Sequence, residues 1–193
     1  MSTKDKQNIE NALNNLLRMD GQTNNNENSD VSNVGAILGI ARAHMMLKQT
    51  PKAKAQLKKV LGRSWSFEDA DYLEQCWLLL ADLYINQLKY DVATELLQTC
   101  LKHNASCVKS MEFLGYIREK EQKWIEATAY YEKAWLLTKM KNPTIGYKLA
   151  FNQLKSKRFI DAIDICHTVL KQYPNYPKIK RDVLDKARAN LRI

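Results

Sequence analysis

The sequence is poor in glycine and proline, and it contains no long apolar run. Its 193 residues include six Gly and four Pro, too few for a loop-rich all-β fold or a disordered chain. No apolar run approaches the ~18 residues of a membrane-spanning helix. The start, MSTKDKQNIE, has no apolar core, so we expect no secretory signal. With 45% hydrophobic and 26% charged residues, the chain has the composition of one globular domain.

Residues that could support chemistry are also scarce. The four cysteines form no CxxC pair, and they are too few for a disulfide scaffold, which favours a reduced, cytosolic chain. No phosphate-binding glycine loop, HExxH or GxSxG motif is present. His103 and Cys107 lie four residues apart and could share a helix face as metal ligands, but a helix end followed by a turn is favoured. We therefore predict no enzymatic activity, no catalytic residue, no metal and no cofactor.

Charge is distributed unevenly along the chain. Residues 1–140 carry 18 basic and 17 acidic groups, whereas residues 141–193 carry 12 basic and 4 acidic groups. The excess could form a docking face for an acidic partner, a membrane headgroup or nucleic acid, or a solvated face that maintains solubility. The predicted basic C-terminal face consists of Lys178, Lys180, Arg181, Lys186 and Arg188.

The apolar period is helical throughout, which predicts an all-α fold. Ile9, Leu13, Leu16 and Leu17 form one stripe, so residues 1–19 are expected to form a short amphipathic helix. Residues 20–33 are Asn-rich and polar, which predicts a flexible linker. The folded body should then begin after Asp30, a suitable helix N-cap.

A repeat is visible when the chain is aligned on four alanines: Ala53, Ala93, Ala127 and Ala162. Their separations are 40, 34 and 35 residues, and a small residue precedes each alanine by twelve positions. The first spacing implies an insertion of about six residues near GRSWSFEDA. In that insertion Trp65 and Phe67 are expected to anchor the loop on the core or, alternatively, to form an exposed knob.

This pattern resembles the tetratricopeptide repeat, a helix–turn–helix unit of about 34 residues. The resemblance implies a right-handed superhelical α-solenoid over residues 34–193. We expect about four repeats (34–62, 74–107, 108–141 and 143–176) and a C-terminal capping helix over 177–193. The fourth repeat departs from the pattern, with Gly146 where the family prefers Trp. The residues expected to pack the helix pairs are Ala41, Ala53, Trp77, Ala81, Ala93, Gly115, Ala127, Ala150 and Ala162.

The first helices of such repeats line a concave face, where partners can bind. Helical spacing from the small positions predicts a partner-binding groove of Arg42, Met45, Asp82, Ile85, Tyr116, Glu119, Tyr147 and Phe151. The alternative is that these side chains pack inside the superhelix.

The C-terminal half is also similar to a narrower family. FLGYIREKEQKWIEATAYYEKAW, NPTIGYKLAFNQLKSKRFIDAIDICHTVL and YPNYPKIKRDVLDKARANL resemble the C-terminal repeats of the long tetratricopeptide subunits of the intraflagellar transport A complex. The resemblance covers about residues 34–193, and residues 1–33 are not expected to share it. It implies a scaffold for retrograde ciliary transport and ciliary assembly, located at the cilium or flagellum and basal body. Its partners would be other subunits of that complex, with no small-molecule substrate and no integral membrane segment.

Two alternatives remain. One is a generic tetratricopeptide adaptor for a chaperone or another assembly, although Arg42 and Asp82 do not match the residues that clamp chaperone carboxylates in this family. The other, less favoured, is a nucleic-acid binder in which Phe159, Tyr173 and Tyr176 stack on bases beside lysines.

Overall fold

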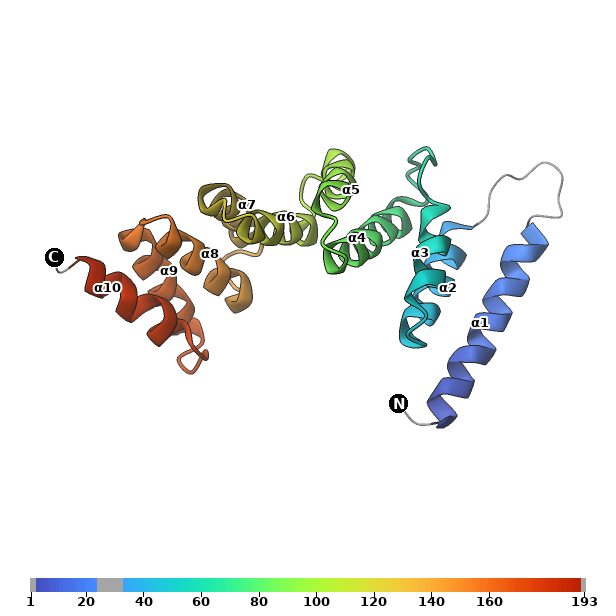
Figure 1. The fold of residues 1–193 in the computed structure, drawn as a ribbon, viewed down its shortest axis with the longest axis horizontal. Coiled ribbons are helices and arrows are strands. Elements are labelled where there is room, and N and C mark those ends of the chain that lie inside the picture. The colour runs from blue at the N-terminus through green and yellow to red at the C-terminus, as the bar shows by residue number, and fades with distance from the viewer. Residues whose placement is uncertain (1–2, 24–32, 192–193) are drawn as a thin grey trace. The chain divides into compact units, whose positions relative to one another are not determined.

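The computed structural model describes residues 3–23 and 33–191, and within these ranges the chain forms helices and turns alone (Figure 1). The prediction of an all-α fold is therefore confirmed. The α-helices are α1 (Thr3–Thr23), α2 (Val34–Met46), α3 (Thr50–Lys58), α4 (Ala70–Asn86), α5 (Tyr90–His103), α6 (Val108–Lys120), α7 (Trp124–Leu137), α8 (Pro143–Lys155), α9 (Phe159–Gln172) and α10 (Asp185–Leu191). A π-helical turn, η1 (Lys180–Leu184), leads into α10.

Helices α2 to α9 form four consecutive pairs, α2/α3, α4/α5, α6/α7 and α8/α9. We call the first member of each pair its A helix and the second its B helix. Three A helices have 13 residues, whereas α4 has 17 and begins at Ala70, ahead of the predicted repeat start at residue 74. The extra turn of α4 takes up part of the insertion that the repeat spacing implied.

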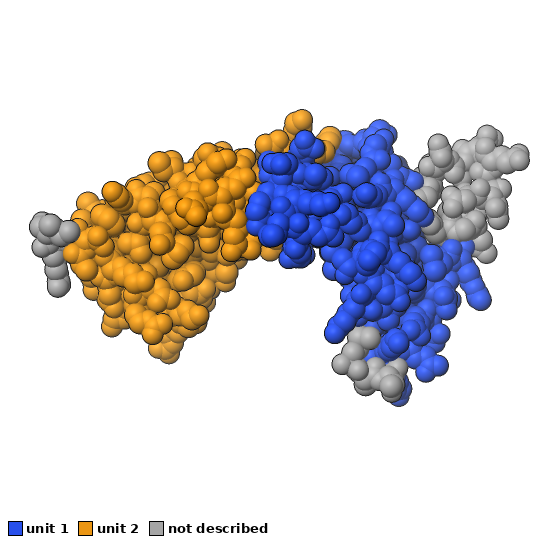
Figure 2. Space-filling model, viewed as in Figure 1, with its two compact units in different colours: residues 1–96 blue, residues 97–193 orange. Residues whose placement is uncertain are grey.

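The chain divides into two compact units, residues 1–96 and 97–193 (Figure 2). The division falls inside α5. In the first unit, α2 packs against α1, α3 and α4. In the second unit, α7 packs against α6 and α8, and α8 packs against α9.

Helix α1 belongs to the packing of the first unit. Leu13 is buried in a small apolar cluster with Ile40 and Ala43 of α2. Residues 20–23 of the predicted linker lie within α1, while residues 24–32, including Asp30, lie outside the described residues. The N-cap of α2 is instead Asn33, whose Oδ1 accepts from the backbone N–H of Gly35 at 2.9 Å.

Small residues bring the two helices of each pair close together. Every alanine expected to pack the pairs has zero exposed surface, and Trp77 is 6% exposed. In the third pair, a Cβ added to Gly115 would lie 2.9 Å from the Tyr131 ring. A side chain at residue 115 would therefore collide with the buried Tyr131 ring.

Gly146 departs from the repeat pattern for a related reason. A Cβ on Gly146 would lie 2.6 Å from Val169 Cγ2 and 2.8 Å from Trp135 Cζ3. Trp135, from the B helix of the preceding pair, is 2% exposed. The fourth A helix has no tryptophan at position 146, and the ring of Trp135 from α7 fills the space beside Gly146 instead.

All four A helices end in the same backbone turn. Lys48, Leu88, Gln122 and Lys157 each adopt a left-handed conformation with φ between 58° and 63°. In each turn the next residue's N–H returns to the carbonyl five positions earlier, as from Gln49 to His44 at 2.8 Å. This bonding satisfies the end of the A helix and directs the chain into the B helix.

The predicted cap follows the fourth pair. It begins with η1 at Lys180, after Pro177, and continues into the seven-residue α10. The expected inner stripe is buried, with Ile179, Val183 and Ala187 at zero exposure and Leu184 at 3%. These side chains join the apolar core of the second unit, which closes the end of the α8/α9 pair.

The inserted segment lies between α3 and α4. Trp65 is 41% exposed and Phe67 is 86% exposed. The side chain of Phe67 therefore does not anchor this segment on the core.

Candidate protein-binding surface

The predicted groove residues lie on all four A helices, two on each. In the first unit, Arg42 is exposed and Met45 is half-buried on α2. On α4, Asp82 is half-buried, but Ile85 is 6% exposed and belongs to the core. The accessible members in this unit are therefore Arg42, Met45 and Asp82.

Arg42 also links two A helices of the first unit. Its Nη2 donates to Gln75 Oε1 of α4 at 2.6 Å. Also at the surface, Lys54 of α3 donates to Gln87 Oε1 at 2.6 Å, and its Nζ lies 4.0 Å from the centroid of the Tyr84 ring. Both bonds join a cation to a neutral amide, so neither of these two cross-links pairs opposite charges.

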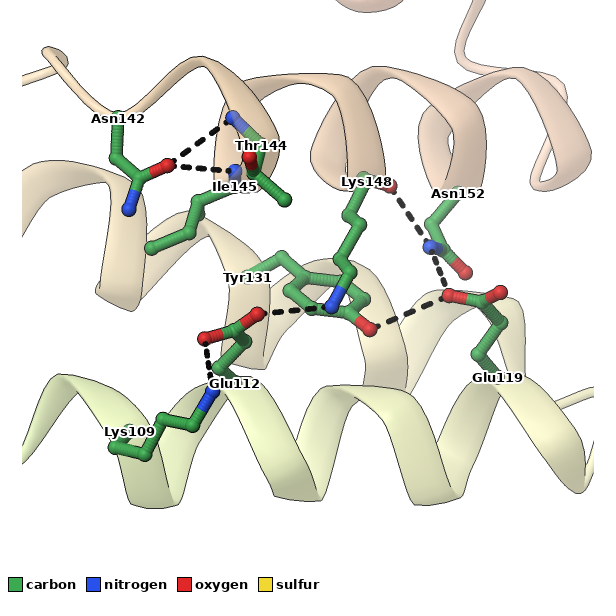
Figure 3. A network of polar contacts seen from close by, with 9 residues as sticks. All are labelled: Lys109, Glu112, Glu119, Tyr131, Asn142, Thr144, Ile145, Lys148 and Asn152. Carbon is green, nitrogen blue, oxygen red and sulfur yellow. Dashed lines mark hydrogen bonds and ion pairs between the residues drawn. The ribbon is translucent and has the colours of Figure 1, made fainter. Parts of the chain in front are cut away.

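In the second unit, an ion pair joins the A helices α6 and α8 (Figure 3). Lys148 Nζ of α8 lies 2.9 Å from Glu112 Oε1 of α6. Lys109, on the same helix as Glu112, contacts the other carboxylate oxygen at 3.1 Å. The side chain of Glu112 is 16% exposed and that of Lys148 is 27% exposed, so the pair is partly shielded from solvent.

Glu119, a predicted groove residue, is held in a second cross-link between the same helices. Its Oε2 accepts from the Tyr131 hydroxyl at 3.3 Å and from Asn152 Nδ2 at 3.1 Å. Figure 3 shows the Tyr131 ring between this contact and the Glu112–Lys148 pair. Glu119 is therefore engaged in positioning α8 against α6, which leaves it less free to bind a partner.

The ionisation of these groups follows from their surroundings. Burial alone would raise the pKa of Glu112, but the hydrogen bonds and charges of Lys148 and Lys109 hold that pKa below the ordinary value. Burial and the neighbouring Glu119 carboxylate raise the pKa of Tyr131. Its hydroxyl thus stays protonated and can donate to Glu119.

Aromatic side chains continue along the A helices of this unit. Tyr147 stacks on Phe151, with ring centroids 6.4 Å apart and an interplanar angle of 28°. The ring centroid of Tyr176 lies 6.2 Å from that of Tyr147. Tyr116 of α6 is half-buried, with Lys120 Nζ 5.2 Å from its ring centroid. These rings are partly exposed and held by their neighbours, so they can offer a rigid apolar contact area.

The five residues of the predicted basic C-terminal face are all exposed. Arg181 pairs with its neighbour Asp182 at 3.3 Å, and Arg188 Nη2 lies 3.0 Å from His167 Nε2 of α9. Lys178, Lys180 and Lys186 form no ion pair with a residue that the structure describes.

A cavity of about 440 Å³ brings the two predicted sets together in the second unit. Phe151 of the predicted groove and Lys186 of the basic face both line it. The remaining lining residues are Leu154, Lys155, Lys157, Phe159, Asp182, Ala189 and Asn190. The volume lies in the range of about 300–1,000 Å³ that is typical of ligand-binding pockets.

Two of the cysteines are unsuited to nucleophilic chemistry. All four are buried, and burial raises the pKa of Cys76 and of Cys166 to about 12. The thiols of these two residues therefore remain protonated at neutral pH, whereas a nucleophilic cysteine needs its thiolate. Among the described helices, none combines the length and apolar character that crossing a membrane requires.

Sequence reasoning missed Glu112, Lys148, Asn152 and Trp135. A signal existed for the first, because Glu112 lies seven positions before Glu119 and so shares its helix stripe. Lys148 and Asn152 are likewise four positions apart on α8. No spacing within the fourth repeat points to Trp135, since this residue belongs to the preceding one.

Comparison with known proteins agrees with this repeat architecture. A family profile described as the tetratricopeptide repeat protein 21 C-terminal ARM domain matches residues 1–188. The chain belongs to this family. Tetratricopeptide repeat protein 21B of Homo sapiens is 51% identical over 192 residues, and the homologous protein of Caenorhabditis elegans is 52% identical over the same length. Each match covers 100% of this chain and 14% of the relative.

Residues 1–33 therefore share the family likeness, contrary to the expectation from the sequence. The Asn-rich composition of residues 20–33 concealed it, since it resembles a linker in any protein. The chain spans about one-seventh of the length of these tetratricopeptide repeat protein 21 relatives.

Solved structures show the same fold at low sequence identity. The C-terminal part of a repeat-containing protein from Cytophaga hutchinsonii has a TM-score of 0.74 at 14% identity, covering 98% of this chain and 68% of that one. A crystal structure of MamA has a TM-score of 0.70 at 16% identity, covering 90% and 96%. These likenesses establish a tetratricopeptide-type α-solenoid fold.

Proposed function

We propose that the chain is a non-catalytic scaffold segment of the intraflagellar transport A complex. In this role it supports retrograde ciliary transport and ciliary assembly, at the cilium or flagellum and the basal body, through contacts with other subunits. The observation that carries the proposal is the match to tetratricopeptide repeat protein 21 along the whole chain. The matched residues include the three stretches that resemble the long tetratricopeptide subunit of that complex.

The packing supports a role as a binding platform. Repeats that contact their immediate neighbours present an extended surface whose shape is fixed by the stack. In the second unit, the two cross-links between α6 and α8 hold Tyr147 and Phe151 at set positions. A partner can therefore bind this surface without first ordering it, which reduces the entropic cost of association.

The test is cross-linking mass spectrometry on the complete protein, tagged and purified from its own ciliated cells. We expect lysines within this chain to cross-link to other subunits of the transport complex, which should co-purify in near-stoichiometric amounts. Cross-links from this chain mainly to chaperones would favour a generic adaptor, and cross-links to ribonucleoproteins would favour nucleic-acid binding. Either result would overturn the proposal.

A packing variant separates contacts of this chain from contacts made elsewhere in the protein. Gly115→Trp would drive an indole into the Tyr131 ring, and it should abolish the cross-links of residues 97–193 while other parts of the protein stay bound. Ala129→Trp, which adds an indole at an exposed position of α7 and removes no lysine, is the surface control and should leave those cross-links unchanged. Retention of the cross-links in Gly115→Trp would show that the folded surface does not make them.

A further inference from the structure

The cavity beside the cap of the second unit has an apolar floor and a basic rim. Phe151 and Leu154 of α8 and Phe159, the first residue of α9, form the floor, and all three are half-buried. Lys155, Lys157 and Lys186 are exposed at its edge. Helix α10 completes the wall with Ala189 and Asn190, so the site exists because the cap closes over the last pair.

The charge at the rim is poorly compensated from within. None of the three rim lysines forms an ion pair with any residue in the described part of the chain. Asp182 is the one carboxylate that lines the cavity, and it already pairs with Arg181 at 3.3 Å. The rim therefore carries three lysine charges, and the single carboxylate beside them, Asp182, is already paired with Arg181.

We propose that this cavity docks an acidic protein segment that inserts one large apolar side chain over Phe151, Leu154 and Phe159 and places carboxylates beside Lys155, Lys157 and Lys186. The proposal deepens the protein-binding role proposed above and names the chemistry of a partner. An apolar anchor surrounded by complementary charge is the arrangement that gives protein interfaces both affinity and orientation.

The floor is held in place before any partner arrives. Phe151 stacks on Tyr147, and Lys155 Nζ lies 5.5 Å from the centroid of the Phe151 ring. On the opposite wall, Asn190 Nδ2 donates to the backbone carbonyl of Lys186 at 2.7 Å. The rings and the basic rim thus need little rearrangement to receive a side chain.

A protein segment fits the cavity better than a nucleic acid does. Tight binding to a phosphate backbone needs many cationic contacts along a strand, whereas here three lysines surround one cavity whose wall includes Asp182. The Asp182 carboxylate repels phosphates and partner carboxylates alike, so the feature that favours a protein segment is the apolar floor, which accepts a leucine or an aromatic side chain.

The experiment measures fluorescence anisotropy of a labelled peptide with six glutamates around one tryptophan, titrated with the full chain. We expect binding that weakens with added salt, at least tenfold weaker binding when the peptide's tryptophan is replaced by serine, and a similar loss when its glutamates are replaced by glutamines. Equal or tighter binding of a single-stranded oligonucleotide of matched length would overturn the proposal in favour of nucleic acid.

Two pairs of variants locate the site. Lys155→Glu/Lys186→Glu should weaken peptide binding at least tenfold, whereas Lys102→Glu/Lys133→Glu, with the same charge change at exposed positions elsewhere, should change it less than twofold. Ala189→Trp fills the cavity without altering charge and should also block binding, whereas Ala129→Trp on the exposed face of α7 should not. Equal effects within either pair would overturn the assignment to this cavity.

This outcome is separable from that of the proposed function. Peptide binding at the cavity without cross-links to the transport complex would leave the docking site standing and remove the scaffold assignment. Cross-links to the complex without peptide binding would support the scaffold assignment and overturn the docking site.

Discussion

The two units build similar helix pairs with different chemistry. Residues 1–96 carry 11 basic and 12 acidic groups, whereas residues 97–193 carry 19 basic and 9 acidic groups. In the first unit, exposed Arg42 joins two A helices through a neutral amide. In the second, the partly buried Glu112–Lys148 pair and the bonds of Glu119 perform that task. The repeat register thus sets where helices cross, and local side chains decide how firmly they are held.

The units also differ in the residue that allows close approach. In the first, Ala41 and Ala81 supply the small positions of the A helices, and each has zero exposed surface. In the second, Gly115 fills this position in α6, and Ala150, with zero exposed surface, fills it in α8. Gly115 and Gly146, which lies one turn before Ala150, approach the rings of Tyr131 and Trp135 at distances that leave no room for a Cβ. The second unit is therefore the more sensitive to added volume.

Among the variants that test this difference between the units, Gly146→Leu should lower stability the most. The new side chain would collide with Val169 and Trp135, and overpacking of this kind costs about 3 kcal/mol. Hydrogen-exchange mass spectrometry should show faster exchange throughout residues 97–193. Gly39→Ala in the first unit is the control, because its Cβ would meet the flexible end of Leu16 at 3.1 Å. It should leave exchange unchanged or slower, and equal damage from both variants would contradict the comparison.

Lys148→Met should have the next largest effect. It leaves the half-buried Glu112 with Lys109 as its remaining cation, and we expect a loss of about 1–2 kcal/mol in the free energy of unfolding. Lys109→Met removes the more exposed partner, whose side chain is 52% exposed, and should cost less than about 0.5 kcal/mol. Chemical denaturation of both variants measures the difference, and a larger cost for Lys109→Met would reverse the assignment.

Acid should weaken the second unit through Glu112. Its pKa is lowered in the folded state, so its contribution to stability is present above the ordinary glutamate pKa of about 4.3. That contribution is lost as the pH falls through the lowered value. Glu112→Gln should therefore flatten the decline in unfolding free energy below pH ~4.3. An unchanged acid limb in denaturation curves at several pH values would contradict the ion pair.

Arg42→Ala should have the smallest effect. The Arg42–Gln75 bond is exposed, so its loss should change the free energy of unfolding by less than about 0.5 kcal/mol. A loss comparable to that of Lys148→Met would remove the contrast between the units.

Much of the fold was predictable, because it depends on local periodicity. The alanine register located the crossing points in both units, and the inner stripe of the cap was identified from Ile179, Val183, Leu184 and Ala187. By contrast, the space beside Gly146 in the fourth repeat is filled by Trp135, which belongs to the third repeat. A search within one repeat cannot detect a side chain that comes from its neighbour.

The candidate surface was predictable only in part. Spacing identified the A-helix stripe, but it could not distinguish Ile85, which is buried, from Tyr147, which is partly exposed. It also could not show that Glu119 is engaged by Tyr131 and Asn152, because those bonds depend on how two helices pack. The cavity escaped prediction since its walls come from three segments of the chain.

The four identical turns at the ends of the A helices have a consequence for engineering. Each turn is closed by its own backbone bonds around a left-handed Lys48, Leu88, Gln122 or Lys157. Because the same backbone bonds close all four turns, we expect a short segment from one pair to replace the turn of another. Glycine at any of the four positions would remove a steric penalty of roughly 1–2 kcal/mol, which makes these turns convenient sites for building longer or hybrid arrays.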